Sequence, residues 1–392
     1  MRQAVIVSAT RTPIGSFHGI LSSVPATKLG SIAIAEALKK IELSAEEVDE
    51  VIMGNVLSAG LGQAPARQAA LGASLPNSVG CTTINKVCGS GLKAVMLANQ
   101  AIVAGDAEVV IAGGMESMSN APYLLPKARA GYRLGHGELI DSMIRDGLWD
   151  VYHQFHMGEA AELCGETLNI SREEQDQFSS LSYRRALEAQ KRGDFKREIV
   201  AVPVAKNKGA EKLVDEDEEP KRLRPEELSK LSPVFKWKGT ITPGNASSIS
   251  DGAAALAVMS EDKAEALGLR PLARIIGYSG FATEPAMFTT APAQAIFALL
   301  KNCRCDLTDI DLFEINEAFA VASIAVNREL DLDPGKVNVR GGAVALGHPI
   351  GASGARILTT LIHALEDLDL VTGVASLCIG GGEAVALMIE RV

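Results

Sequence analysis

Two segments of this chain have the same pattern of acidic and apolar residues. Such an internal repeat limits the possible folds more than any other feature of the sequence. Residues 46–56 (EEVDEVIMGNV) and 308–318 (TDIDLFEINEA) each place acidic residues before an apolar run that ends near an asparagine. About 40 residues further on, each is followed by a Ser-Gly pair, at Ser90 and Ser353, and then by apolar residues at helical spacing. The same elements in the same order predict two homologous halves.

Each predicted helix leads into an apolar run that closes on glycines, at residues 107–114 and 373–382. These runs are almost continuously apolar, which is typical of strands in a sheet that is covered on both faces. The predicted fold class is therefore α/β. Hydrophobic residues make up 47% of the chain and aromatic residues only 4%, so the core is expected to consist mainly of Ala, Val, Ile and Leu.

The two halves differ in length because the first carries an insertion. In the second half the last strand follows its glycines directly, whereas the matching strand of the first half, residues 251–260, lies far downstream. This pattern predicts an N-terminal half of residues 1–119 plus 249–270, an insertion of residues 120–248, and a C-terminal half of residues 271–392.

The insertion differs in composition from both halves. It has helical spacing over residues 171–193 and then becomes strongly charged over residues 211–230. We interpret the charged run as a solvated surface segment. Three basic residues within it could instead meet phosphates: Lys221, Arg222 and Arg224.

Charge and patterning exclude several classes of function. The formal net charge of −10 argues against a general nucleic-acid-binding protein. No run of about 18 apolar residues is seen, so no membrane span is expected. The N-terminal residues are typical of a strand and not of a targeting signal, which predicts a cytoplasmic location.

The six cysteines are expected to be reduced, because a long chain with a large core does not depend on disulfides. Cys303 and Cys305 stand close together in sequence, but no second Cys or His pair has the spacing of a zinc site. The sequence therefore predicts no bound metal.

Four residues fall where ligands bind in α/β folds, at the carboxyl ends of strands and beside helix N-termini. Cys88 precedes the first Ser-Gly pair, Asn316 ends a strand, His348 opens a glycine-rich turn, and Cys378 ends a strand before three glycines. Each alone has an ordinary structural explanation, such as a buried cysteine, a strand-end cap or a histidine that fixes a loop. Because all four stand at equivalent edges of the duplicated halves, they together predict a shared site.

A dinucleotide-binding site is a rival interpretation of the same stretch. Residues 89–94 (GSGLKA) match the pattern G-x-G-x-x-A, and Glu116 lies near where a ribose-binding acid would be sought. That pattern must follow a buried strand, but residues 81–87 (CTTINKV) are short and polar. The sequence therefore favours a cysteine-based site.

At these residues the chain resembles the thiolase family. NKVCGSG resembles the family's nucleophile motif, NEAFA its Asn motif, GGAVALGHPIGASGAR its His motif and CIGGG its second-cysteine motif. The resemblance extends from about Val5 to Val392 and also covers AGGMESMS, HMG and GNASS. It implies two α/β halves in a five-layer αβαβα arrangement, with an inserted loop domain that holds coenzyme A.

The segment YLLPKARAGYRLGHGELIDSMIRDGLWD is similar to the insertion of the family's short-chain acetoacetyl-CoA branch, including its tetramer-forming loop. The resemblance thus implies a homotetramer, a dimer of dimers. It also implies the condensation of two acetyl-CoA to acetoacetyl-CoA and coenzyme A, and the reverse thiolysis. Acyl-CoA thioesters would be the substrates, and no cofactor is implied.

Two positions depart from the usual pattern of the family. Ala384 stands where the family often has a further glycine, which is a mild change. Phe288 stands against the acyl pocket where many relatives have Met, and this leaves the preferred acyl chain open. One alternative is a 3-ketoacyl-CoA thiolase that acts on longer chains in fatty-acid β-oxidation. Another is a relative that binds acyl-CoA without turnover, which would be expected to lack one of the reactive residues.

The resemblance assigns a role to each motif residue. Cys88 is expected to carry the acyl group, in a turn whose helix N-terminus favours a thiolate, and His348 to take its proton. Cys378 is expected to act as the acid or base at the α-carbon, while Asn316 holds a water and Gly380 donates its backbone N–H to an oxyanion. The other substrate-binding residues implied by the family are Leu148, His156, Met157, Phe235, Ser247, Phe288, Ala318 and Phe319.

Overall fold

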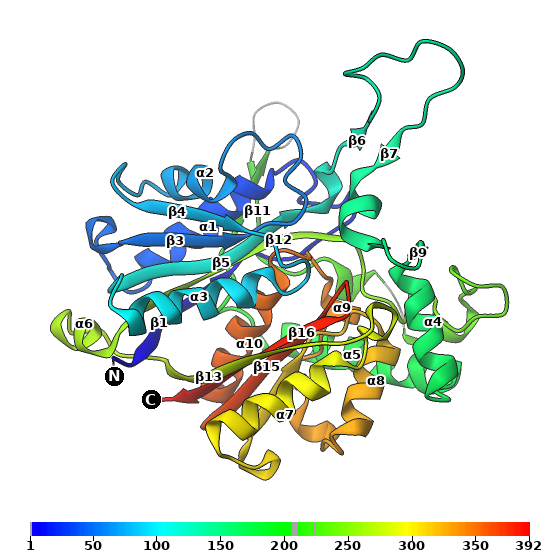
Figure 1. Ribbon diagram of the computed structural model, residues 1–392. Helices are drawn as coiled ribbons and strands as arrows, with labels where there is room; N and C mark the ends of the chain where they lie inside the picture. Colours follow the sequence, from blue (N-terminus) through cyan, green and yellow to red (C-terminus); the bar gives the residue numbers. More distant parts are fainter. Residues whose placement is uncertain (1, 206–210, 223–224) are drawn as a thin grey trace.

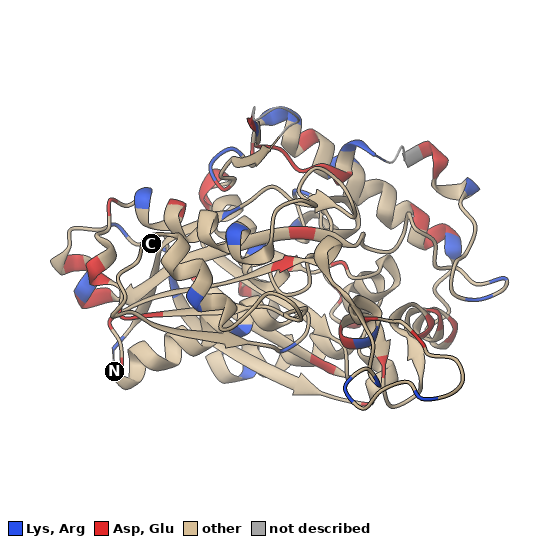
Figure 2. Ribbon diagram, turned by 90° about the horizontal axis from the view of Figure 1, so that it is seen from above, with Lys and Arg blue, Asp and Glu red and all other residues tan. Residues whose placement is uncertain are grey.

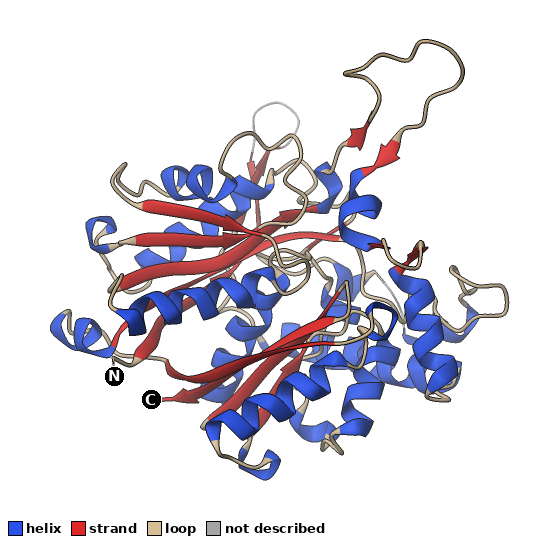
Figure 3. Cartoon of the chain, viewed as in Figure 1, coloured by secondary structure: helices blue, strands red, loops and turns tan. Residues whose placement is uncertain are grey.

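A ten-stranded sheet runs through the molecule in two parts, here called the first and second sheet, with helices between and outside them (Figures 1 and 3). The computed structural model describes residues 2–205, 211–222 and 225–392. The strands of the first half are β1 (Ala4–Arg11), β2 (Gly15–Ser16), β3 (Glu50–Gly54), β4 (Gly80–Ile84), β5 (Val109–Ser117) and β12 (Ser250–Ser260). Those of the second half are β13 (Ala273–Ala282), β14 (Leu312–Ile315), β15 (Thr372–Ile379) and β16 (Glu383–Arg391). The strand order is β14-β15-β16-β13-β1-β12-β5-β3-β4, and a short pairing of β13 with β1, at Val5–Arg274 and Ile6–Ala273, links the halves.

The helices form three layers around these two sheets. The central pair, α3 (Ser90–Ala104) and α10 (Ser353–Asp367), pack against each other and against strands of both halves. Outside the first sheet lie α1 (Ala26–Lys39) and α2 (Pro65–Gly72), and outside the second lie α7 (Ala291–Cys303) and α8 (Ala320–Glu329). The shorter helices are α6 (Glu261–Ala266) and α9 (Ala343–Leu346). The predicted α/β fold with layers in the order αβαβα is confirmed.

The duplication seen in the sequence also appears in the hydrogen bonds. Asp49 accepts two backbone N–H groups at the entrance to β5, at 2.8 and 2.9 Å. Asp311 accepts two at the entrance to β15, both at 2.9 Å. After Asp49, β3 runs parallel to β5, and after Asp311, β14 runs parallel to β15. The acidic residue before each apolar run therefore holds two parallel strands in register.

The elements between β5 and β12 lie outside the main sheets. They are β6 (Tyr123–Leu124), β7 (Ile140–Asp141), β8 (Trp149–Asp150), β9 (Phe155–His156), α4 (Met157–Thr167), α5 (Arg172–Arg192), β10 (Val202–Ala205) and β11 (Glu211–Val214). The helix expected over residues 171–193 is α5, whose N-terminus is capped by Ser171 and Glu174. The segment between β6 and β7 projects from the molecule as a long arm (Figure 1). Basic and acidic residues are interspersed over this region (Figure 2).

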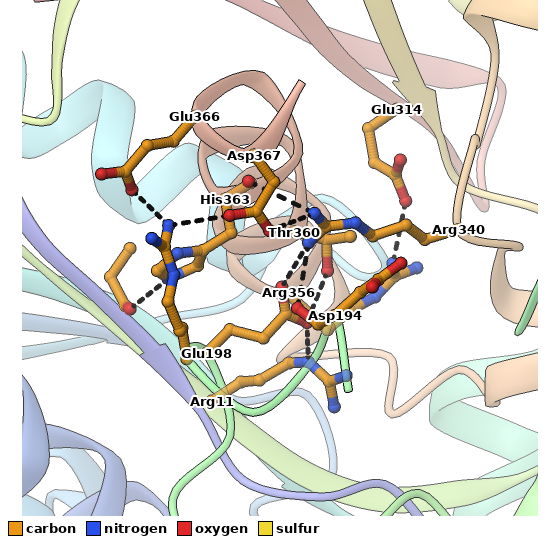
Figure 4. Close-up of polar contacts among 12 residues, drawn as sticks. Arg11, Asp194, Glu198, Glu314, Arg340, Arg356, Thr360, His363, Glu366 and Asp367 are labelled. Carbon is orange, nitrogen blue, oxygen red and sulfur yellow. Dashed lines mark hydrogen bonds and ion pairs between the residues drawn. The ribbon is translucent and has the colours of Figure 1, made fainter. Parts of the chain in front are cut away.

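A buried cluster of charged side chains joins the insertion to both halves around α10 (Figure 4). Arg11 of β1 donates to Glu198 of the insertion at 2.5 Å, and Thr360 of α10 donates to the same carboxylate at 3.1 Å. Arg356, also on α10, pairs with Glu314 of β14 at 3.1 Å. Buried ions need such partners because the loss of hydration is costly. The cluster therefore fixes α10 relative to three parts of the chain.

One segment, residues 87–104, is long and apolar enough to cross a membrane by length and composition, although the sequence suggested no such stretch. It contains α3, and 56% of it is buried inside the protein. Because α3 packs between the two sheets, its apolar character serves the core of the molecule.

Candidate active site

Cys88 lies in the turn between β4 and α3, and the first residue of the helix holds that turn. The Ser90 hydroxyl donates to the carbonyl of Val87 at 2.7 Å and accepts from the backbone N–H of Lys86 at 2.8 Å. Val87 has a positive φ of 47°, which turns the chain sharply before the cysteine. Cys88 is therefore held two residues before the start of α3.

The two Ser-Gly pairs of the repeat allow the central helices to meet at their N-termini. A Cβ atom on Gly91 of α3 would lie 2.6 Å from the backbone nitrogen of Ala355 in α10. A Cβ on Gly354 of α10 would overlap Leu92 of α3 in the same way. Glycine is thus required at both positions by close packing. This crossing brings the turn that contains Cys88 next to the turn that contains His348.

His348 is buried, and its two ring nitrogens have different surroundings. Nδ1 lies 2.6 Å from the Ser353 hydroxyl and 3.5 Å from the Asn316 amide nitrogen. Nε2 has no hydrogen-bond partner among the described residues, and the side chain lines the same cavity as Cys88. The structure therefore brings the predicted His and Asn together and leaves Nε2 available to a ligand.

Cys378 and Gly380 approach the site from the end of β15. Cys378 is buried and belongs to an apolar cluster that includes Met157, Phe288 and Phe319. Gly380 lines the cavity, and its backbone N–H is close enough to the Cys88 sulfur to influence the pKa of that thiol. All four predicted motifs thus converge although they come from distant parts of the chain: Cys88, His348 and Gly380 line the cavity, Asn316 lies beside His348, and Cys378 lies near Cys88.

The cavity has a volume of about 750 Å³ and a predominantly apolar wall. All eight positions predicted to bind substrate line it: Leu148, His156, Met157, Phe235, Ser247, Phe288, Ala318 and Phe319. The Phe235 ring stacks on the His156 ring with a centroid separation of 4.7 Å. A Cβ atom on Gly158 would overlap the Phe235 ring, so the glycine after Met157 makes room for it.

Several residues of the cavity wall were not found by sequence reasoning. They are mostly apolar and include Phe17, Met118, Tyr183 and Ile350. Met118 and Ile350 lie within segments already recognised as motifs, AGGMESMS and GGAVALGHPIGASGAR, whereas Phe17 and Tyr183 come from segments with no distinguishing motif. Of the predicted basic cluster, Arg222 lines the cavity and Lys221 pairs with Glu216 at the surface. Arg224 lies outside the described residues.

Glu116, considered above as a ribose ligand, has a structural role instead. Its buried carboxylate accepts the backbone N–H groups of Val56, Leu57 and Gly351 at 3.0–3.2 Å. It therefore ties the loop after β3 to the turn that follows His348. The residues before the GSGLKA segment form β4, none of whose residues is fully buried. The dinucleotide interpretation is not supported by this geometry.

Burial sets the protonation states of the reactive groups. It raises the pKa of the Cys88 thiol to about 11, although the backbone N–H groups of Gly380 and of Cys88 itself lower it. Burial also raises the pKa of Cys378, and the nearby Cys88 adds to this. Burial lowers the pKa of His348 to about 3, with a further contribution from the charge of Arg356. The favourable effect of the helix N-terminus on the Cys88 thiolate, expected from the sequence, is therefore outweighed by the loss of hydration.

We expect iodoacetamide to alkylate Cys88 at a rate that still rises above pH 9, because the thiolate is the nucleophile and burial raises its pKa to about 11. The rate at each pH would be followed by mass spectrometry of the peptide that contains Cys88. Free glutathione is the control, since an unperturbed thiol has a pKa of about 8.5. A rate that levels off below pH 8 would contradict this prediction.

No group of three or more His, Cys, Asp or Glu side chains placed to hold a metal ion is found within residues 2–205, 211–222 and 225–392. All six cysteines are free thiols.

The fold and the cavity define an α/β protein whose two homologous halves bring a cysteine, a histidine and a second cysteine to one apolar site. The chain belongs to the thiolase family. Residues 4–262 match the model of the thiolase N-terminal domain, and residues 269–391 match that of the thiolase C-terminal domain. The predicted family is confirmed.

Similar proteins match this chain over nearly their whole length. The chain is 53% identical over 391 residues to the acetyl-CoA acetyltransferase of Schizosaccharomyces pombe, covering 100% of this chain and 99% of that one. It is 54% identical over 391 residues to acetyl-CoA acetyltransferase 2 of Arabidopsis thaliana, covering 99% and 97%. The crystal structure of the Bacillus anthracis acetyl-CoA acetyltransferase is similar, with a TM-score of 0.98, 45% identity, and coverage of 100% and 99%.

Proposed function

We propose that this chain is an acetyl-CoA C-acetyltransferase, which condenses two acetyl-CoA to acetoacetyl-CoA and coenzyme A and catalyses the reverse thiolysis. One observation supports this function above all: Cys88, His348 and Gly380 share a single apolar cavity with the residues predicted to bind the pantetheine arm. The relatives named acetyl-CoA acetyltransferase match along the whole chain, which disfavours the longer-chain alternative. Acetoacetyl-CoA formation from acetyl-CoA by the purified protein tests the proposal.

The first step transfers an acetyl group to Cys88. The Cys88 proton moves to His348 Nε2, and the thiolate attacks the carbonyl carbon of acetyl-CoA. The backbone N–H groups of Cys88 and Gly380, which already face the sulfur, stabilise the oxyanion. Coenzyme A leaves with the proton of Cys378. The enzyme then holds an acetyl thioester on Cys88, an imidazolium at His348 and a thiolate at Cys378.

The second step forms the carbon–carbon bond. The Cys378 thiolate removes a proton from the methyl carbon of a second acetyl-CoA, and the His348 Nε2–H stabilises the enolate oxygen. The enolate carbon attacks the acetyl group and expels the Cys88 thiolate, which takes back the proton of His348. The raised pKa of Cys378 suits this role, because a thiolate that is hard to form is a strong base. We assign Asn316 to a water beside this oxyanion, and we infer that no cofactor takes part.

The entrance of the cavity is suited to the nucleotide end of coenzyme A. Arg222 lines the cavity, and its ion pair with Glu219 is long, at 3.9 Å. The Arg222 side chain is exposed and its partner is distant, so the pair contributes little and a phosphate can compete for the guanidinium. We therefore assign phosphate binding to Arg222 in preference to Lys221.

The size of the acyl pocket can be tested at Phe288. The Phe288 ring is 3% exposed, lines the cavity and packs in one cluster with Cys378. We expect Phe288→Ala to raise kcat/KM for six- and eight-carbon 3-ketoacyl-CoA relative to acetoacetyl-CoA by about 10-fold or more, because each methylene in an apolar pocket changes discrimination by roughly 1–3 kcal/mol.

Steady-state thiolysis of a series of chain lengths measures this ratio. The ratio does not depend on the fraction of active enzyme, so it is insensitive to the loss of stability expected from removing a buried ring. A wild-type preference for eight carbons, or an unchanged ratio in the variant, would contradict the assignment. The longer-chain alternative would then be favoured.

A homotetramer, arranged as a dimer of dimers, is proposed with this function. The projecting arm supports it, because Leu134 is 99% exposed and Leu139 is 70% exposed in the single chain. The mass of the particle in solution tests the tetramer. A role in lipid metabolism is proposed because the substrates are acyl-CoA thioesters. A cytoplasmic location is proposed as well, and cell fractionation tests it.

A further inference from the structure

The surroundings of His348 indicate how its proton is placed, and Ser353 is the residue that decides it. Ser353 is the first residue of α10 and is fully buried. Its hydroxyl lies 2.6 Å from His348 Nδ1 and donates to the carbonyl of Pro349 at 2.9 Å. We propose that Ser353 is a positioning residue that accepts a hydrogen bond from His348 Nδ1–H and so leaves the Nε2 lone pair free to take the Cys88 proton. This role rests on the function proposed above.

The assignment follows from counting protons, and it takes the 3.5 Å approach of the Asn316 amide nitrogen to Nδ1 as a contact without a hydrogen bond, since the Ser353 contact is far shorter. A serine hydroxyl has one proton, and the contact with Pro349 already uses it. The 2.6 Å contact with Nδ1 is then a hydrogen bond only if the ring nitrogen carries the proton. In the opposite arrangement Ser353 would donate to Nδ1, the bond to Pro349 would be lost, and a buried Nε2–H would have no acceptor among the described residues. Burying an unpaired donor costs free energy, so the first arrangement is favoured.

The same contact serves both protonation states of the histidine. When Nε2 takes the proton that leaves the Cys88 sulfur, the S–H electron pair stays on sulfur and the ring becomes an imidazolium. Nδ1–H still donates to Ser353, and Nε2–H is now the donor for an oxyanion. No hydrogen bond of the ring has to be exchanged during the cycle. A preorganised site of this kind avoids reorganisation at the moment of reaction.

The helix that carries Ser353 is held firmly along its polar face. Arg356, Thr360 and His363 follow Ser353 at helical spacing and contact Glu314, Glu198 and the carbonyl of Ala9. Figure 4 shows these side chains of α10 directed into the buried charged cluster. The hydroxyl is therefore fixed relative to both halves of the molecule, as positioning of the imidazole requires.

The matching residue of the other half shows the same use of the hydroxyl. Ser90 also begins a central helix, donates to a carbonyl of the preceding turn and accepts from a donor of that turn. The donor is a backbone N–H in the first half and, by our assignment, the imidazole in the second. An accepting serine at the start of the helix is thus a feature of both halves.

We expect Ser353→Ala to slow acetylation of Cys88 at pH 7 by about 10²–10³-fold, the range of a lost general base, with little change in KM for acetyl-CoA. The deficit should shrink as the pH rises toward 10, because the thiolate then forms without a base. Single-turnover acetylation by acetyl-CoA, measured from pH 6 to 10, tests this. Thr359→Val is the matched control, since it removes a buried hydroxyl from the same helix that has no hydrogen-bond partner among the described residues and does not contact His348.

The role of Ser353 would be overturned if the wild type acetylates Cys88 and the Ser353→Ala variant does so at the same rate. A deficit of the variant that is the same at every pH would overturn it too. A wild-type protein that is not acetylated would overturn the proposed function instead. The tautomer is tested separately by solid-state ¹⁵N spectra of histidine-labelled wild type, with the His348 signal identified from its absence in His348→Asn. A neutral ring with its proton on Nδ1 is expected, and a proton on Nε2 would refute the assignment even if the alanine variant fails to fold.

Discussion

Replacing Cys88 by serine is expected to lower the rate of acetoacetyl-CoA formation by about 10⁴-fold or more. The cavity already raises the pKa of the thiol to about 11, and the same loss of hydration would make a serine alkoxide far harder to form. Removal of a catalytic nucleophile has effects of this size in other enzymes. The wild-type protein should carry an acetyl group on the peptide that contains Cys88 after incubation with acetyl-CoA.

Mass mapping of the acetylated protein and steady-state assays of the variant measure both expectations. Cys305→Ser is a suitable control, because Cys305 lies after α7, packs in a separate cluster and does not line the cavity. Its activity should stay within about twofold of the wild type, as for most substitutions away from a site. An acetyl adduct confined to Cys378 would reverse the roles of the two cysteines.

The second large effect is expected for Cys378→Ala, and it should separate the two steps of the reaction. Acetylation of Cys88 needs His348 and the backbone N–H donors, and coenzyme A can leave as its thiolate. Condensation also needs a base at the α-carbon, whose contribution is typically 10²–10⁴-fold. The variant should therefore accumulate acetyl-Cys88 but form acetoacetyl-CoA at a rate reduced by at least about 10²-fold.

Quenched mixtures of the variant and acetyl-CoA would be examined for the acetyl adduct and for acetoacetyl-CoA. Cys164→Ala is the matched control, because Cys164 is equally buried in the same apolar cluster. It removes the same atoms without removing the proposed base. Condensation by Cys378→Ala at nearly the wild-type rate would show that Cys378 is an ordinary core cysteine.

Much of the architecture could be predicted because it is encoded in local patterns. The alternation of apolar runs and helical spacing, repeated after Asp49 and Asp311, indicated two α/β halves. The structure places both aspartates at equivalent strand entrances. The sequence showed the Ser-Gly pairs as part of the repeat. The structure shows why glycine is needed there: α3 and α10 cross closely at Gly91 and Gly354. That reason involves two helices that are distant in sequence.

The reactive residues could also be named from the sequence, because Cys88, His348 and Cys378 stand in short motifs beside glycines. The protonation states of these residues could not be predicted from the sequence. A motif shows a thiol at a helix N-terminus and predicts a low pKa, whereas the pKa depends on all the groups that exclude water from the sulfur. The favourable effect of the helix N-terminus on the Cys88 thiolate is outweighed by burial for this reason.

By itself, then, the sequence determined the duplicated α/β plan, the family and the identity of the reactive side chains, because periodicity and motif spacing are properties of neighbouring residues. Only the tertiary structure decided the contact of Ser353 with His348, the structural role of Glu116 and the effect of burial on the pKa of Cys88. Hydrogen-bond partners and desolvation depend on segments brought together by folding. The pKa of a buried group and the energy of a hydrogen-bond network depend on many residues that are distant in sequence, and no local pattern connects these residues.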